Sequence, residues 1–371
     1  MNAGLSYLDW NATAPVRPEA AAAVAQALAT VGNASSVHRA GRAARRLLEA
    51  ARANVAALVG AHTENVVFTS GGTEANALAL RAFPDRRVLV SALEHDSVLA
   101  NAPDAVRVPA TRDGLVDLKT LERLLATDIR PALVSLMFAN NETGAIQPIA
   151  EAARIAHQHG ALIHCDAVQV AGRQPIDMGR LGCDLMTLSA HKLGGPMGVG
   201  ALVVAGGIDI APLVRGGGQE RNRRAGTENL PGIAGFGAAA SAAIAGVTVW
   251  DAVATLRAQA ETRLVAISPD AMVYAAAAPR LPNTICISMP GVPAATQVMA
   301  LDLAGVMVSA GAACSSGKVR RSHVLDAMGV PERDAECAIR VSLGWSTSEA
   351  EIDHLVDAWG ALYARTRVSA A

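Results

Sequence analysis

The sequence predicts an α/β protein with a large domain, built on a mostly parallel sheet flanked by helices, and a smaller α+β domain. From about residue 60 onwards, short apolar runs alternate with helical stretches, which is typical of a parallel sheet covered on both faces. From about residue 256 this alternation weakens. A chain of 371 residues also exceeds the usual size of a single core. We expect residues 15–254 to form the large domain, and residues 1–14 with 255–371 to form the small one.

Two helices open the predicted large domain. Residues 19–31 are rich in Ala, and residues 39–59 form a more charged helix that ends at Gly60. Five apolar or β-branched runs follow, each ending in a polar, Gly-rich or His-containing turn: residues 65–70, 87–92, 132–139, 161–165 and 184–189. Helices lie between several of these strands, for example at residues 149–158. Ligands of such sheets bind at the carboxyl ends of the strands, where the unusual polar residues of this chain gather.

The predicted small domain has fewer strands. Its expected elements are a helix at 255–265, strands near 283–289 and 306–309, a loop at 310–321, a helix near 324–328, a strand at 338–342 and a closing helix at 348–364.

Composition excludes several classes of function. The net charge is −1 and the charges are interspersed, which argues against a nucleic-acid or membrane partner. The longest uncharged stretch, residues 229–250, is dominated by Gly, Ala and Ser, so a buried helix explains it better than a membrane span. The first residues lack the pattern of an export signal, and the five cysteines show no paired spacing. We therefore expect reduced thiols and a cytoplasmic protein.

A glycine-rich turn, Ser70-Gly-Gly-Thr-Glu74, follows a predicted strand and opens a helix. Glycines allow close approach of the backbone, and the free N–H groups at a helix start attract phosphate. Gly72 and Thr73 are the candidate phosphate ligands. A turn that uses glycine only for its geometry remains the alternative.

Lys192 follows another apolar strand, next to a Gly-Gly-Pro turn, where a lysine can form an imine with an aldehyde cofactor. Ser189 and His191 beside it can donate to a phosphate. Asp166 ends the preceding strand and can keep a pyridine nitrogen protonated. Alone, Lys192 would be read as a surface lysine and Asp166 as a turn cap. A phosphate turn, a lysine and an aspartate together are what pyridoxal phosphate (PLP) requires.

Other polar residues follow these strands. His95 can stack on a cofactor ring and move protons, although a histidine at a helix start is the simpler interpretation. Asn141 and Gln169 can reach a ring oxygen, although Asn is a common turn former. The His and Cys residues between 157 and 166 match no closed metal site, and we expect none. The Gly- and Arg-rich segment 216–229 is typical either of a surface loop or of a segment that binds an anion across a subunit boundary.

Cys314 lies in a run of small residues, Ser309-Ala-Gly-Ala-Ala-Cys-Ser-Ser-Gly-Lys318, with Arg320 and Arg321 downstream. Cationic neighbours and exposure favour a reactive thiolate. The other four cysteines stand in apolar or element-like contexts and are expected to be inert.

These motifs together resemble the cysteine desulfurases, in particular the subgroup that serves nitrogen fixation and general iron–sulfur cluster assembly. The resemblance runs from residues 7–15 (YLDWNATAP) almost to the end of the chain, and includes residues 32–38 (GNASSVH) and the motifs SGGTE, NNETG, HCDAVQ and SAHK.

The resemblance implies a fold-type-I PLP-dependent transferase that works as a homodimer. Lys192 would bind the cofactor covalently, Asp166 its pyridine nitrogen, and His95 its ring face. The remaining implied ligands are Asn141 and Gln169 for the ring oxygen, Gly72, Thr73, Ser189 and His191 for the phosphate, and Thr227 for the phosphate of the other subunit. The substrate carboxylate would bind Arg340 and Asn141.

The implied reaction converts L-cysteine to L-alanine, with the sulfur held as a persulfide on Cys314. An iron–sulfur scaffold or another acceptor protein would then receive it. The alternatives are a selenocysteine lyase, another class-V PLP aminotransferase, and a non-catalytic scaffold that kept the fold.

Overall fold

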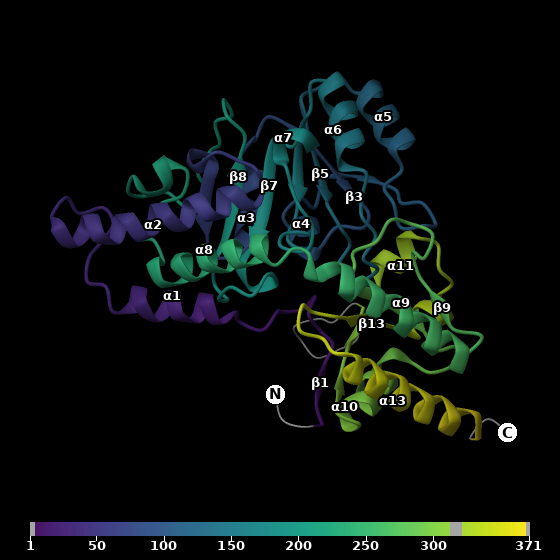
Figure 1. Cartoon of the computed structure of the whole chain (residues 1–371). Coiled ribbons are helices and arrows are strands. Elements are labelled where there is room, and N and C mark those ends of the chain that lie inside the picture. Colours follow the sequence, from purple (N-terminus) through teal and green to yellow (C-terminus); the bar gives the residue numbers. More distant parts are fainter. Residues whose placement is uncertain (1–3, 312–320, 369–371) are drawn as a thin grey trace.

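The computed structural model describes residues 4–311 and 321–368 of the chain (Figure 1). A seven-stranded sheet forms its larger part, in the order β2-β8-β7-β6-β5-β3-β4. The strands are β2 (Val66–Thr69), β3 (Arg87–Ser91), β4 (Val106–Val108), β5 (Ala132–Met137), β6 (Leu162–Asp166), β7 (Leu185–Ser189) and β8 (Gly200–Val204). The pairs from β4 to β7 are parallel, and β8 runs antiparallel to both of its neighbours. This arrangement confirms the predicted fold class.

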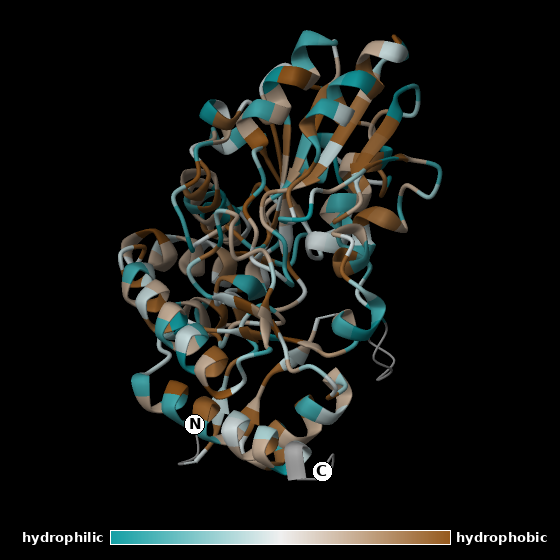
Figure 2. Cartoon of the chain, turned by 90° about the vertical axis from the view of Figure 1, so that its right-hand side faces the viewer, coloured by the Kyte–Doolittle hydropathy of each residue, from teal (hydrophilic) through white to brown (hydrophobic). Residues whose placement is uncertain are grey.

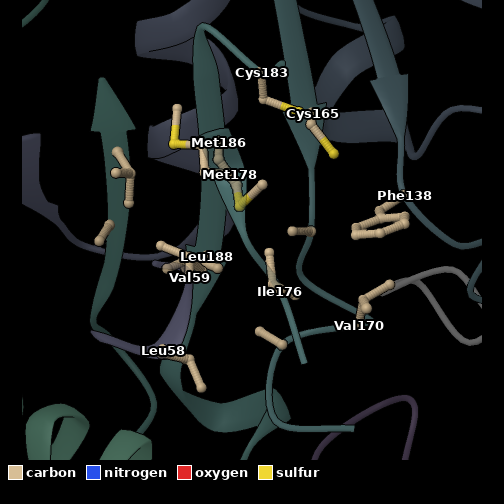
Figure 3. Packing of buried hydrophobic residues seen from close by; sticks show 14 of the residues in the cluster. Leu58, Val59, Phe138, Cys165, Val170, Ile176, Met178, Cys183, Met186 and Leu188 are labelled. Carbon is tan, nitrogen blue, oxygen red and sulfur yellow. The ribbon is translucent and has the colours of Figure 1, made fainter. Parts of the chain in front are cut away.

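Helices cover both faces of this sheet. They are α1 (Pro18–Leu28), α2 (Arg39–Leu58), α3 (Gly72–Arg81), α4 (Asp96–Leu99), α5 (Leu118–Thr127), α6 (Ile149–Gln158), α7 (Met178–Leu181) and α8 (Leu230–Ala245). Side chains that alternate along a strand point to opposite faces. One buried cluster accordingly joins Val134 and Met186 to α2, α6 and α8, and another joins Leu133 and Leu185 to α3. Figure 3 shows part of the first cluster, where Cys165 of β6 lies beside Cys183, and Met186 of β7 lies beside Met178.

The smaller part is built on a four-stranded antiparallel sheet in the order β12-β13-β10-β9. Its strands are β9 (Met272–Val273), β10 (Thr284–Ser288), β12 (Ser309–Ala310) and β13 (Ala338–Ser342), and its helices are α9 (Val249–Ile267), α10 (Ala294–Leu303), α11 (His323–Ala327), α12 (Glu332–Ala335) and α13 (Glu349–Val368). A separate pair joins β1 (Ser6–Tyr7) to β11 (Val306–Met307). The single strand expected at 306–309 is thus two strands of different sheets.

The beginning of the chain therefore packs against residues that follow it by about 300 positions. Leu8 belongs to the same buried cluster as Trp359 of α13 and Ile287 of β10. In Figure 1 β1 accordingly lies beside α13. α9 runs through residue 254, and the domain boundaries at 14 and 254 stay a prediction.

Hydropathy follows the layers: in Figure 2 many strands of the larger part are brown, while the surrounding helices alternate between teal and brown. Within the described ranges, no single helix is both long and apolar enough to cross a membrane. The pair α8 and α9 meets that test only when joined, and it is bent by 76°.

Candidate active site

A cavity of about 630 Å³ lies at the carboxyl ends of the parallel strands. Its wall combines four parts of the chain: the turns after the strands of the large sheet, the segment that follows β1, β12 and β13 of the small sheet, and the start of α11. The predicted site residues that line it are Gly72, Thr73, His95, Asn141, Asp166, Gln169, Ser189, His191, Lys192 and Arg340. Thr227 is exposed before α8 and does not line this cavity. Cys314 lies outside the described residues.

The glycine-rich turn places the start of α3 in the cavity wall. Gly71 precedes the helix and has no side chain that could cap its first N–H groups. A Cβ atom on Gly72 would lie 3.2 Å from Val168 Cγ2 and 3.4 Å from Ser189 Cβ, so the backbone here approaches its neighbours closely. Glu74 is turned away, since it accepts from Ser70 N–H at 2.8 Å and pairs with Arg224 at 2.9 Å. The free N–H groups therefore suit an anion.

Lys192 ends the short 3-10 helix η2 (Ala190–Lys192) directly after β7. Its Nζ donates to the carbonyl oxygens of Asn11 at 2.6 Å and Ala12 at 2.8 Å. Burial, and then the charges of Arg340 and Arg173, lower the pKa of Lys192 to about 7. A large fraction of the amine is therefore neutral at neutral pH and can attack an aldehyde.

His191 lies beside it with a neutral ring. Its Nδ1 lies 3.1 Å from Thr13 Oγ1. Burial, and then the charge of Lys192, lower the pKa of His191 to about 4. The ring can therefore hold a phosphate by a hydrogen bond, without adding a second cation to the site.

A hydrogen-bond network links Asp166 to His95. Asp166 accepts from Val168 N–H at 3.0 Å and from Asn76 Nδ2 at 2.8 Å. Asn76 Nδ2 also donates to Ser97 Oγ at 2.9 Å, and Ser97 Oγ lies 2.8 Å from His95 Nδ1. Asn76 and Ser97 were not predicted. In the sequence alone, a buried amide within a helix looks the same as an exposed one.

The tautomer of His95 follows from its position as the cap of α4. Its Nδ1 accepts from Ser97 N–H at 3.0 Å. Since a backbone N–H can only donate, Nδ1 carries no proton and the ring proton is on Nε2. Burial lowers the pKa of His95. His95 therefore presents a neutral imidazole to the cavity.

Arg340 on β13 is buried, with 5% of its surface exposed. One of its terminal nitrogens donates to Asp9 Oδ1 at 2.8 Å, and the other to Asn141 O at 3.2 Å. Its Nε has no partner within the described ranges. Asn11 joins the same region, because its Nδ2 donates to Asn141 O at 3.1 Å and Thr284 Oγ1 at 2.9 Å. In the sequence Asp9 and Asn11 stand out only as members of the YLDWNATAP motif, whereas the structure gives each of them specific contacts.

The cysteines at 165, 183, 286 and 337 are buried and free. Burial raises the pKa of Cys165 well above its ordinary value, and that of Cys286 is raised for the same reason. His164 is held between the hydroxyls of Ser135 and Thr187, each at 2.9 Å. Across the two described ranges, no group of three or more His, Cys, Asp or Glu side chains could hold a metal ion.

Comparison with known proteins identifies the family of this chain. The model of the class-V aminotransferases matches residues 6–355. A cysteine desulfurase of Cereibacter sphaeroides is 46% identical over 366 residues, which cover 95% of this chain and 94% of that one. A cysteine desulfurase of Sinorhizobium fredii is 40% identical, with 98% and 97% covered.

Solved structures of similar fold support the same family. A NifS-like protein from Rickettsia africae superimposes with a TM-score of 0.91 at 35% identity, over 97% of this chain and 99% of that one. SspA in complex with cysteine superimposes with a TM-score of 0.78 at 26% identity, over 91% and 98%. This chain therefore belongs to the class-V aminotransferase family, in the group of the cysteine desulfurases.

Proposed function

We propose that this protein is a PLP-dependent cysteine desulfurase that converts L-cysteine to L-alanine and receives the sulfur on Cys314. The observation that carries the proposal is one cavity in which three features meet. These are the amine of Lys192 with its pKa lowered to about 7, the hydrogen-bonded carboxylate of Asp166, and the start of α3, where Gly71 provides no capping side chain.

The family uses PLP, and the residues present fit it. The close backbone at Gly72 and the neutral ring of His191 suit a phosphate, and the two donors on Asp166 suit a carboxylate that faces a pyridinium. The proposed ligands are Gly72, Thr73, Ser189 and His191 for the phosphate, Asp166 for the pyridine nitrogen, His95 for the ring, Asn141 and Gln169 for the ring oxygen, and Lys192 for the aldehyde carbon. When bound, the cofactor supplies an electron sink for the Cα–H bond.

The chain's own groups would then act on the substrate. The guanidinium of Arg340, held by Asp9, would bind the substrate carboxylate with two parallel hydrogen bonds. The amine of Lys192, free to accept a proton near neutral pH, would move the proton at Cα. The neutral ring of His95 would present Nε2–H toward the cavity.

The sulfur step would need a thiolate at Cys314. Its sulfur would attack the sulfur of the substrate, so that an S–S bond forms while the Cβ–S bond breaks. The electron pair of the broken bond would stay on the carbon, where protonation gives the methyl group of alanine. The persulfide on Cys314 would pass to an iron–sulfur scaffold or another acceptor protein.

We also propose a homodimer and a cytoplasmic location. Thr227 is exposed and does not line the cavity of its own chain, which suits a residue that reaches the phosphate in the partner subunit. The described cysteines are buried free thiols, which suits a reducing compartment.

The test compares wild type and Cys314→Ala, each loaded with PLP and given L-cysteine and a thiol reductant. Wild type should release alanine and sulfide in equal amounts, and the variant should keep the yellow colour but lose both products. Full activity of the variant on cysteine would remove Cys314 from the mechanism. Activity that survives only on selenocysteine would indicate a lyase, and pyruvate as product a transaminase.

A further inference from the structure

Arg173 is a buried arginine that does not line the cavity but lies directly behind it. Only 4% of its surface is exposed. It follows β6 in a turn that is anchored by Trp250, whose Nε1 donates to Gly172 O at 2.7 Å. Its guanidinium also lies 6.0 Å from the Trp250 ring. The position is fixed by packing, so its hydrogen bonds are well defined.

The charge of Arg173 is not paired with a carboxylate within the described ranges. Burial, and then the charge of the nearby Arg340, lower the pKa of Arg173 to about 9. That value is still above neutral, so the group keeps its charge at pH 7. A buried guanidinium without an acid is costly. Ion pairing therefore does not explain the presence of this one.

Arg173 sets the orientation of Gln169. Its NH1 donates to Gln169 O and, at 2.6 Å, to Gln169 Oε1. Because a guanidinium has no acceptor, the side-chain oxygen of Gln169 must face Arg173, and the amide nitrogen must face the other way. That nitrogen donates to Asn11 O at 3.1 Å. Its second hydrogen is left for the cavity, which Gln169 lines.

The same carbonyl oxygen of Asn11 accepts from Lys192 Nζ at 2.6 Å. A continuous chain of hydrogen bonds thus connects Arg173, Gln169, Asn11 and Lys192. The direction of each hydrogen bond is fixed, because the guanidinium of Arg173 can only donate and the carbonyl oxygen of Asn11 can only accept.

Several charged groups surround Lys192. Arg340 on β13 and Arg173 behind the cavity are positive, while Asp9 of the N-terminal segment and Asp166 of β6 are negative. The neutral rings of His95 and His191 also lie close to it. The other titratable groups of the cavity wall are Asp96, Glu142, Arg321 and His323. Burial is the largest influence on Lys192, and the two arginines follow it in lowering its pKa.

We propose that Arg173 is a positioning residue of the active site. Without touching cofactor or substrate, it locks the Gln169 amide and, through Gln169 and the carbonyl oxygen of Asn11, helps to fix the position of Lys192, while its charge acts on Lys192 from behind the cavity. This inference deepens the proposed function and rests on it.

The test uses the full-length holoenzyme and the pH titration of its visible absorbance, which reports protonation of the Lys192 nitrogen in its bond to the cofactor. Arg173→Met removes the charge, so the midpoint should rise by about one pH unit, the lower end of the effect of a neighbouring charge. Arg173→Lys keeps the charge and should restore the wild-type midpoint. Arg173→Gln, which retains a donor without a charge, is measured in parallel in case the Met variant does not fold.

Arg87→Met is the matched control. Arg87 also donates to main-chain carbonyls, those of Leu124 and Asp128, but it lies at the start of β3, at the opposite end of the strand from the site. It should leave the midpoint unchanged. Equal midpoints in wild type, the control and a folded, coloured Arg173→Met or Arg173→Gln would overturn the inference alone. A wild-type protein that takes up no colour with PLP would overturn the proposed function as well.

Discussion

Lys192 should make the cofactor-free protein less stable, and by an amount that depends on pH. Its folded pKa, about 7, is below the ordinary value of 10.5. Folding therefore opposes the charged form. The cost is fully present below pH 7, decreases as the pH rises from 7 to 10.5, and is absent above that range. Replacing Lys192 with Met, a neutral side chain of similar length, should therefore stabilise the cofactor-free protein most at low pH.

The magnitude follows from the two pKa values, whose difference is 10.5 − 7 = 3.5 units. With about 1.36 kcal/mol per unit, the cost is about 5 kcal/mol at pH 6 and about 2 kcal/mol at pH 9. The Met variant also loses the two hydrogen bonds to Asn11 O and Ala12 O, each worth about 1 kcal/mol. That loss does not vary with pH. The advantage of the variant should therefore shrink by about 3 kcal/mol between pH 6 and pH 9.

The assay is urea unfolding at both pH values, after the cofactor has been removed from wild type with hydroxylamine. Lys119→Met, at an exposed position of α5, is the control and should show no such change with pH. The reasoning is refuted if the difference in unfolding free energy between Lys192→Met and wild type is the same at pH 6 and pH 9.

Three further predictions concern the support of Asp166, the binding of the substrate carboxylate, and a buried ion pair away from the cavity. Asn76→Leu removes one charge-assisted donor from Asp166, worth about 2 kcal/mol, so the Kd for PLP should rise about 30-fold in an absorbance titration. The same change also removes Asn76 Oδ1, a buried atom with no partner among the described residues, so the unfolding free energy should fall by less than about 2 kcal/mol. Arg340→Lys loses bidentate pairing, and steady-state kinetics should show KM for cysteine raised about 10- to 100-fold. Glu220→Gln leaves the buried Arg52 charge with only the half-exposed Glu49 as a carboxylate partner, and denaturant unfolding should show a loss of about 3 kcal/mol.

The strands that the sequence predicted are those with an apolar run and a clear turn after it. β4 was missed because it has three residues, two of them exposed, and so has no apolar run. β8 was missed because Gly200 begins it within a glycine-rich stretch, which reads as a loop. Its antiparallel pairing with β2 and β7 cannot be recognised without the fold.

The residues of the site likewise fall into those that the sequence predicted and those that it did not. Lys192 and Asp166 could be predicted because a charged residue directly after an apolar strand is conspicuous. Asn11 and Asn76 could not, because their roles depend on contacts that are distant in the sequence. Asn11 meets Thr284 across 273 positions, and Asn76 meets Asp166 across 90. Local pattern gives no sign of such partners.

The most direct test of the central claim is to locate the sulfur. The protein is incubated with L-cysteine without reductant, alkylated, digested and mapped by mass spectrometry. We expect one additional sulfur atom on the peptide that carries Cys314. None is expected on the peptides of Cys165, Cys183, Cys286 or Cys337, because those thiols are buried. An additional sulfur on one of these four, or sulfide release with no modified cysteine, would contradict the account.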